Sequence, residues 1–369
     1  MSVKKFLWQI PTTIAYASLV VLLISAFSDR VSPFTNSYIP FLGLFFPFIL
    51  LFNVLFFLFW LIFKKWAQAA VTIGVFLICW GSIHTYFPLH TKTKTVPEDC
   101  IKILTYNVMR FEHMKKHTKE NPNPIIQYVI DQDPDIVCFQ EYGVSTEKSK
   151  TEITESDAKN ALKHTPYYTV EALQYPYSNY VFGLAVFSKY PILSTRKLPI
   201  ESDYNGSVVI ELDINGRKTT LINNHLESNK IAPEERSDYY NLTKDLDTQK
   251  LEAFTHTMFQ RLTPAFKLRA GQADLIAEVI KESKNPYIIV CGDFNDTPIS
   301  YARHKIKGDL TDSFVESGSG MGITFNMYRF LFRIDYLFHS KNIKAYNCTV
   351  GNLKNSDHYP VWTYLQFKD

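Results

Sequence analysis

Two carboxylates and a carboxamide follow directly on an apolar run in the segment YIIVCGDFND, residues 287–296. Asp293, Asn295 and Asp296 are residue types that strands disfavour, so they depart from the preference of the residues before them. One interpretation is a turn, because Gly, Asp and Asn are turn formers. The other is that a buried strand delivers oxygen ligands to its carboxyl end, where open α/β sheets bind their ligands. This segment alone leaves both interpretations open.

The same pattern recurs along the chain. Further polar residues at or near the ends of apolar strand-like runs are Asn107 in IKILTYN, Glu141 in PDIVCFQE, His225 in KTTLINNH, Asp335 in RIDYLFHS, and Asp357 with His358 in SDHYP. One polar strand end is a turn, whereas six such sites in one domain form a pattern. Carboxylate and amide oxygens suit Mg²⁺ or Mn²⁺, and no Cys/His cluster with zinc spacing is present.

Each of these residues also has a purely structural interpretation. Asn107 would serve equally well as a strand-end cap, and a single histidine such as His225 is more often a structural one. Asp335 would pair with Arg333 or Arg329 in a buried ion pair. The functional interpretation therefore rests on all of the residues occurring together in one domain.

The elements that must position these residues can be predicted coarsely. A polar linker over residues 92–100 precedes the first strand, and Asn123 with Pro124 marks a helix start. Asn215-Gly216 is a strong hairpin signal between two strands. Residues 232–283 are charged and helical in character, and we expect Pro264 to break them into two helices. Strands joined both by hairpins and by helices predict a mixed sheet.

Residues 1–91 have a different character from the rest. No charged residue occurs from Phe6 to Ser28 or from Val31 to Phe63, and a third apolar run follows Lys64 and Lys65. Because a membrane-spanning helix needs roughly 20 apolar residues, we expect an anchor of three transmembrane helices at about 6–28, 38–63 and 66–88. The first apolar run is too long, and is followed by too many others, for a cleaved signal peptide.

Charge gives an orientation and limits the partners. Lys4 and Lys5 precede the first apolar run and Lys64 and Lys65 separate the last two, which predicts a cytoplasmic N-terminus and a domain beyond residue 91 that is periplasmic or extracellular. Only five of the 39 Lys and Arg residues and one of the 36 Asp and Glu residues lie in residues 1–91. The remainder is thus nearly neutral, without the basic excess of a dedicated duplex binder.

The motifs TYNV, FQE, NNHL, GDFND, RIDYLFHS and SDHYPV resemble, in this order, those of the endonuclease/exonuclease/phosphatase superfamily. The resemblance covers roughly residues 101–369 and implies a four-layer α/β sandwich, two mixed β-sheets flanked by helices. It also implies metal ligands and catalytic groups. Expected at the metal, Mg²⁺ or Mn²⁺, are Asn107, Glu141 and Asp357; the expected catalytic residues are His225, Asp293, Asn295, Asp335 and His358. Asp293 and Asn295 would orient water and phosphoryl oxygens, and Asp335 would hold His358, while the general base stays open.

The expected function is a Mg²⁺-dependent phosphoester hydrolase at the outer side of the membrane, with endonuclease activity as the family default. A phosphodiesterase or phosphatase acting on lipid head groups is the alternative, since a membrane tether raises the local concentration of the site near the bilayer. A catalytically inactive membrane protein is the third possibility, and no expected site position is visibly broken. We also hypothesise that residues 229–269 cover the site or contact the bilayer, against a solvated helical pair.

Overall fold

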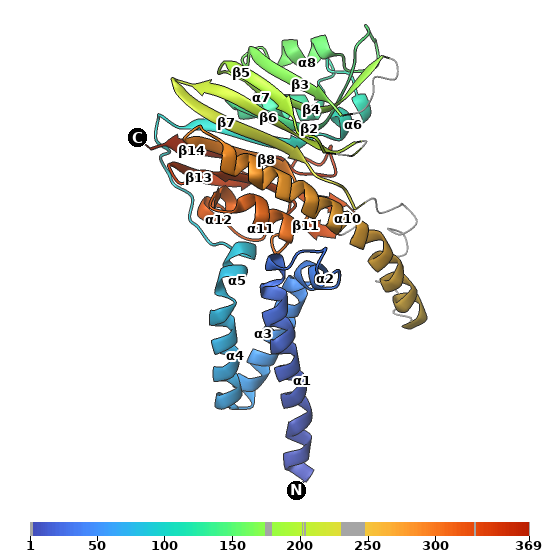
Figure 1. Ribbon diagram of the computed structural model, residues 1–369, viewed down its shortest axis with the longest axis vertical. Coiled ribbons are helices and arrows are strands. Elements are labelled where there is room, and N and C mark those ends of the chain that lie inside the picture. Colours follow the sequence, from blue (N-terminus) through green and yellow to red (C-terminus); the bar gives the residue numbers. More distant parts are fainter. Residues whose placement is uncertain are drawn as a thin grey trace.

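A computed structural model describes residues 3–173, 179–200, 202, 204–229, 248–327 and 330–368. Two six-stranded mixed sheets pack face to face between helices (Figure 1). The first sheet has the order β13 (Ile343–Val350), β14 (Val361–Phe367), β1 (Ile101–Asn107), β2 (Ile136–Ser145), β4 (Tyr180–Ser188) and β3 (Tyr167–Ala172). The second has the order β5 (Ile192–Lys197), β6 (Gly206–Ile214), β7 (Arg217–His225), β8 (Tyr287–Asp293), β12 (Asp335–His339) and β9 (Thr311–Asp312). Two short strands, β10 (Phe325–Met327) and β11 (Phe330–Phe332), pair antiparallel with each other.

Each sheet contains one parallel pair of strands, and its other neighbouring strands are antiparallel. The parallel pairs are β1 with β2 and β7 with β8. The inner faces of the two sheets form one apolar core, to which Ile103, Val186, Ile210 and Ile289 contribute. The expected architecture of two mixed sheets flanked by helices is confirmed.

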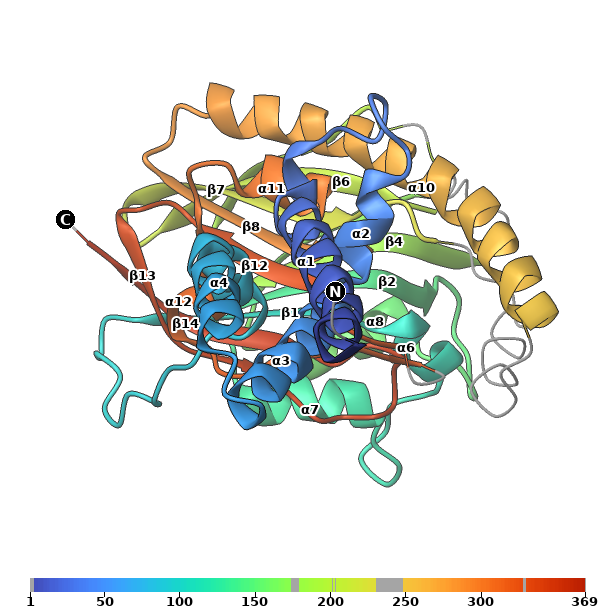
Figure 2. The same ribbon diagram turned by 90° about the horizontal axis from the view of Figure 1, so that it is seen from below.

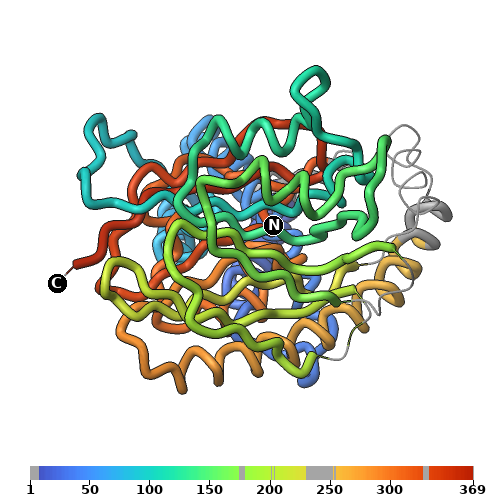
Figure 3. The backbone as a smooth tube through the Cα atoms, turned by 90° about the horizontal axis from the view of Figure 1, so that it is seen from above, coloured from blue at the N-terminus to red at the C-terminus, as the bar shows by residue number. Residues whose placement is uncertain are grey.

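Helices cover both outer faces (Figures 2 and 3). The first sheet carries α6 (Met109–Met114), α7 (Pro124–Gln132) and α8 (Glu155–Ala161), and the second carries α10 (Thr248–Glu282) and α11 (Tyr301–Lys307). A further short helix, α12 (Ser313–Ser317), packs beside β13. As predicted, α7 begins after Asn123, whose side chain accepts hydrogen bonds from the N–H groups of Ile125 and Ile126. Asn215 and Gly216 form the β6–β7 turn, both with positive φ.

The predicted break at Pro264 is wrong, because α10 runs as one helix of 35 residues with Pro264 inside it. Proline removes one backbone N–H from a helix, and here packing offsets the loss: Ala265 and Phe266 are buried. Residues 230–247, which make up much of the segment 229–269, lie outside the described residues.

The prediction of three transmembrane helices also needs correction. The N-terminal helices are α1 (Val3–Ala26), η1 (Ser28–Arg30), α2 (Ile39–Leu44), α3 (Phe46–Ile62), α4 (Trp66–Ile78) and α5 (Trp80–Tyr86). Among the described residues, one helix is long and apolar enough to cross a membrane, over Trp8–Ala26. A second candidate arises only if α4 and α5, bent by 68°, count as one span, and α3 has 17 residues.

Local chemistry explains why the second expected span is divided. Pro47 lies in the first turn of α3, and a proline there favours a new helix start over a continuation of α2. The third span bends after Ile78, and α5 then turns toward the sheets, where the Thr85 carbonyl accepts a hydrogen bond from Arg333. The predicted spans rested on hydropathy alone, which reports neither the helix start at Pro47 nor the contact of Thr85 with Arg333.

Candidate functional site

Three of the predicted catalytic residues form one row across the second sheet. His225 and Asp293 are paired at the carboxyl ends of the parallel strands β7 and β8, and Asp335 is the antiparallel partner of Asp293 at the start of β12. The sheet register therefore fixes their spacing. Nε2 of His225 lies 3.8 Å from Oδ2 of Asp293.

The first sheet delivers Asn107 and Glu141 to the same place. Asn107 ends β1 opposite Gln140, and Glu141 lies in the irregular stretch of β2 between Phe139 and Tyr142, with φ of 49°. The amide nitrogen Nδ2 of Asn107 donates to Oε1 of Glu141 and, across the two sheets, to Oδ2 of Asp293, each at 3.1 Å. The carboxyl ends of both parallel pairs thus meet at one site, as expected of strand ends that bind ligands.

His358 lies against two carboxylates, those of Asp335 and Asp293. Its Nδ1 lies 2.8 Å from Oδ2 of Asp335, and its Nε2 lies 3.5 Å from Oδ2 of Asp293. His225 has a comparable position, with Nε2 3.8 Å from Oε1 of Glu141. His358, Asp335 and Asp293 are all buried. The charges of the imidazole and of the two carboxylates therefore interact with little screening by water.

Asn295 follows the strand in the left-handed region, with φ of 52°. Its backbone N–H donates to Oδ1 of Asp293 at 2.8 Å, and its Nδ2 donates to the carbonyl of Leu226 at 2.9 Å. Asn tolerates this backbone conformation better than most residues. Asn295 therefore orients the Asp293 carboxylate and ties it to the residue after His225.

Burial and neighbouring charge alter the protonation of this cluster. Burial raises the pKa of Asp293 to about 6, partly countered by His358 and His225. Burial alone would lower the pKa of His358, but the charges of Asp335 and Asp293 outweigh it and raise that pKa well above its usual range. The His358 imidazole is thus held in its protonated form, with Nδ1 donating to Asp335 and Nε2 forming an ion pair with Asp293.

Two sets of residues are candidate metal ligands. Ligand atoms of Asp293, Asp335 and His358 lie within 4.8 Å of one another, but Asp335 and the protonated His358 already satisfy each other by a hydrogen bond. A protonated imidazole has no lone pair for a metal. The carboxylate of Glu141 is more suitable, because its side chain is 37% exposed at the mouth of the site and offers hard oxygen atoms beside the Asn107 amide.

The structure brings seven of the eight predicted residues into direct contact, and Asp357 is the exception. Its Oδ1 lies 3.4 Å from Oγ of Ser356. Among the residues that the structure describes, no hydrogen bond or ion pair joins the Asp357 carboxylate to Glu141. Asp357 neighbours the cluster through His358 in the chain, so its role as a metal ligand stays a prediction.

The sequence analysis did not identify Ser356 and Thr324, whose hydroxyl groups form hydrogen bonds with the backbone around the site residues. Oγ of Ser356 donates to the Asn107 carbonyl at 2.7 Å and accepts from the backbone N–H of His358. Oγ1 of Thr324 accepts from the N–H groups of Ile334 and Asp335. Ser356 stands inside the SDH motif, so a signal existed for it, whereas nothing in the sequence marks Thr324.

The chain leaves β1 through an unusual turn. All six residues of α6, Met109–Met114, have φ between 43° and 67°, which is a left-handed helical turn. Such a backbone costs roughly 1–2 kcal/mol per non-glycine residue. Asn123 holds it with two hydrogen bonds from Nδ2, to the carbonyls of Phe111 and Lys115. The turn begins two residues after Asn107, and its Arg110 is exposed.

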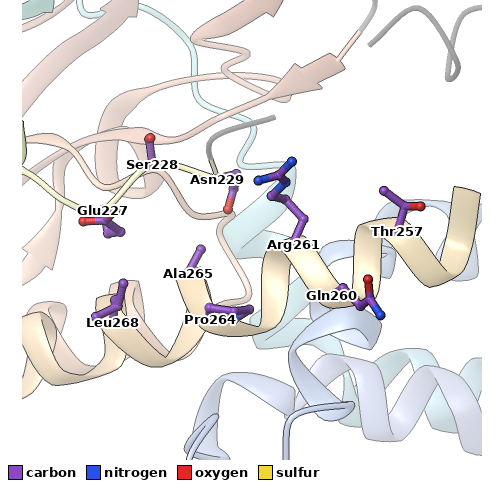
Figure 4. A pocket seen from close by; sticks show the side chains of 9 residues that line it. All are labelled: Glu227, Ser228, Asn229, Thr257, Gln260, Arg261, Pro264, Ala265 and Leu268. Atoms are coloured by element: carbon purple, nitrogen blue, oxygen red, sulfur yellow. The ribbon is translucent and has the colours of Figure 1, made fainter. Parts of the chain in front are cut away.

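A pocket of about 370 Å³ lies beside the site, between α10 and the segment Glu227–Asn229 (Figure 4). Thr257, Arg261 and Ala265 line it from the helix. Its other wall begins at Glu227, two residues after His225 in the chain.

Comparisons with known proteins agree with this arrangement. A family model described as the endonuclease/exonuclease/phosphatase family matches residues 104–358, and a model described as a domain of unknown function matches residues 4–86. No protein of curated function matches.

Two solved structures share the fold at low sequence identity. An endonuclease/exonuclease/phosphatase from Beutenbergia cavernae is 14% identical, with 73% of this chain and 72% of that chain covered and a TM-score of 0.50. The human Nocturnin catalytic domain, solved with a bound sulfate anion, is 16% identical, with 74% and 95% covered and a TM-score of 0.50.

Proposed function

The chain belongs to the endonuclease/exonuclease/phosphatase family, and from this premise we propose that it is a phosphoester hydrolase that depends on a divalent metal ion, Mg²⁺ or Mn²⁺. The observation that carries the proposal is the contact of Asp293 with groups from both sheets. Its Oδ2 lies within 3.8 Å of Asn107, His225 and His358. Here carboxylates, an amide and two imidazoles converge on one point. Such a set of groups is suited to the hydrolysis of a phosphoester.

Glu141 and Asn107 would hold the metal ion, with Asp357 as a third ligand. A bound divalent cation offsets the negative charge that develops on the phosphoryl oxygens under attack. Asp293, fixed by the Asn295 N–H, accepts the proton of the attacking water.

The histidines act at the phosphoryl group. Protonated His358 donates its Nε2–H to a phosphoryl oxygen, while Asp335 holds the opposite side of the ring. His225 stands on the other side of Asp293, where it donates to the phosphate or protonates the leaving oxygen.

Two substrate classes remain for this chemistry. A nucleic acid is the family default, and we propose phosphodiester cleavage of DNA or RNA as the first activity to test. A lipid head group is the second candidate. It is favoured by the contact between the catalytic domain and the apolar N-terminal helices, since Ile299 packs in one cluster with Leu22 and Phe46.

We further propose that the apolar surface of the N-terminal helices contacts a lipid bilayer. Large apolar side chains on three helices are exposed, among them Val20 on α1, Leu55 on α3 and Leu77 on α4. Nζ of Lys65 lies 4.3 Å from the ring of Trp8, so the basic α3–α4 turn is close to the N-terminal end of α1. Positive charge at this end supports a cytoplasmic N-terminus and a catalytic domain outside.

The test is hydrolysis by the full chain in detergent and in lipid nanodiscs, with Mg²⁺ or with EDTA. Plasmid DNA, RNA, sphingomyelin and inositol phospholipids are offered in parallel. Asp293→Asn should abolish cleavage, while Asp309→Asn, at a fully exposed carboxylate, should not. Cleavage that persists in EDTA or in Asp293→Asn would refute the proposal. Labelling of cysteines introduced at residues 64 and 309 with an impermeant maleimide in intact cells tests the orientation.

A further inference from the structure

Two loops connect the catalytic cluster to the N-terminal helices. One loop follows Asp293 and ends at Ile299 before α11, and the other, residues 333–335, leads into Asp335. The hydroxyl of Tyr336 lies 2.9 Å from the Asp296 carbonyl and 2.8 Å from the Arg333 carbonyl, so it joins the two loops. The backbone N–H of Phe294 also donates to the carbonyl of Ile334.

Arg333 attaches the second loop to α5. It is 2% exposed, and its Nη2 donates to the Thr85 carbonyl near the end of α5. Its guanidinium also lies 4.6 Å from the ring of Phe314. Asp335, which holds His358, is only two residues away, so displacement of α5 would act on the start of β12.

Gly43 attaches the first loop to α2. A Cβ at Gly43 would lie 2.3 Å from the carbonyl oxygen of Ile299 and 2.4 Å from Oγ of Ser28. The loop backbone therefore packs directly on the helix backbone, at a position where only glycine fits. The Ile299 side chain is 2% exposed and packs with Leu22 and Phe46 of the N-terminal helices.

A third connection runs through α10. The ring of Phe259 stacks on Phe41 of α2 at 5.1 Å, and Phe266 meets the same ring edge-on at 5.2 Å. One turn further along α10, the buried Arg269 donates from Nε to Oδ2 of Asp296 and from Nη1 to the carbonyl of Glu227. Arg269 thus holds both segments that leave the site, after Asp293 and after His225.

We infer that the N-terminal helices position the catalytic cluster and are not an anchor alone. Arg333 and Ile299 are positioning residues, since neither contacts Asp293 or His358 directly. The packing of α2 and α5 fixes the loops on which Asn295 and Asp335 depend. The catalytic part of this inference rests on the proposed phosphoester hydrolysis, whereas its structural part does not.

Two glycines give a matched test in the full chain. Gly43→Ala places a methyl group against Ile299, whereas Gly74→Ala in α4 adds one where no atom lies within 4 Å. Hydrogen exchange followed by mass spectrometry should show at least about tenfold faster exchange in the peptides covering 294–299 and 333–336 for Gly43→Ala only. Equal exchange in both variants would overturn the inference, and this readout needs no activity.

A second pair of variants makes smaller changes, so that both proteins are expected to fold. Ile299→Val removes one methyl group from the contact with the N-terminal helices, and Ile306→Val removes one from the core beneath the second sheet. With bis(4-nitrophenyl) phosphate and Mg²⁺, Ile299→Val should lower kcat about threefold or more with KM unchanged, and Ile306→Val should not. Equal kcat values in the two variants would contradict positioning. An inactive wild-type chain would refute the proposed function instead, and the exchange experiment would still decide the inference.

Discussion

Asp293 and Asp335 are direct partners on antiparallel strands, and one imidazole lies between their carboxylates. His358 is 3.5 Å from Asp293 and 2.8 Å from Asp335. The buried carboxylates raise the pKa of His358, and the positive charge of His358 in turn lowers that of Asp293 against the effect of burial. The protonation of His358 and that of Asp293 therefore depend on each other.

Asp335→Asn should lower kcat by about 10²-fold, because a positioned acid or base group contributes about 10²–10⁴-fold to a rate. The amide still fits the space but no longer stabilises the charged imidazole. Steady-state hydrolysis measures this effect, with Asp309→Asn as the control for loss of a carboxylate. A kcat within twofold of the wild type would exclude Asp335 from the mechanism.

Replacement of the proposed metal ligand Glu141 should weaken the binding of Mg²⁺ more than it lowers the stability of the fold. Glu141→Gln should raise the Mg²⁺ concentration for half-maximal activity at least about tenfold, since even outer-shell changes cost about 10–100-fold in affinity. Glu147→Gln is the control, at an exposed position six residues further along the chain. Identical Mg²⁺ titrations of the two variants would mean that Glu141 does not bind the metal.

Asn123 should matter to activity as well as to stability. Asn123→Ala removes the cap of α7, worth about 1 kcal/mol, and also releases the left-handed turn that follows Asn107. Thr154→Ala removes a comparable cap, the capping box of α8, without touching that turn. We expect both variants to lower the melting temperature, and only Asn123→Ala to lower kcat. Equal kcat in both would show that the turn does not support Asn107.

Acid should weaken the fold through Asp312. Burial by itself raises the pKa of Asp312, but the charges of Arg303 and Arg333 hold that pKa below its usual range. A carboxylate whose pKa is lower in the folded protein stabilises the fold fully at pH values above its pKa in the unfolded chain, about 3.9. This stabilisation is lost as the pH falls through its pKa in the folded protein.

Asp312→Asn should therefore lower stability at pH 7 by about 3 kcal/mol, the cost of breaking a buried ion pair. The difference from the wild type should shrink below about pH 4, where Asp312 of the unfolded wild-type chain takes up a proton, and should disappear once the pH is below the pKa of Asp312 in the folded protein. Thermal unfolding at pH 7, 5 and 3.5 measures this effect. A difference that stays constant with pH would contradict the assignment.

The motifs of the sequence, through the family that they resemble, predicted the two mixed sheets, and the residue pattern singled out seven of the side chains that converge at the candidate site. Polar residues such as Asn107 and Asp293 stand at the ends of apolar runs, and a strand end is a property of the local chain. The cap at Asn123 and the turn at Asn215-Gly216 are equally local, because hydrogen bonding and φ preference act within a few residues.

Only the tertiary structure decided how these residues combine. The partnership of Asp335 with Asp293, and the position of His358 between them, depends on a register between strands far apart in the sequence. The course of the N-terminal helices was local only in part: Pro47 marks the start of α3 in the sequence, whereas the contacts of α5 with Arg333 and of α2 with Ile299 join segments far apart in the chain. Thr324 acts through backbone groups of another segment, so no pattern of residue types could assign its role. The SDH motif marks Ser356, but only the fold places its hydroxyl against the Asn107 carbonyl.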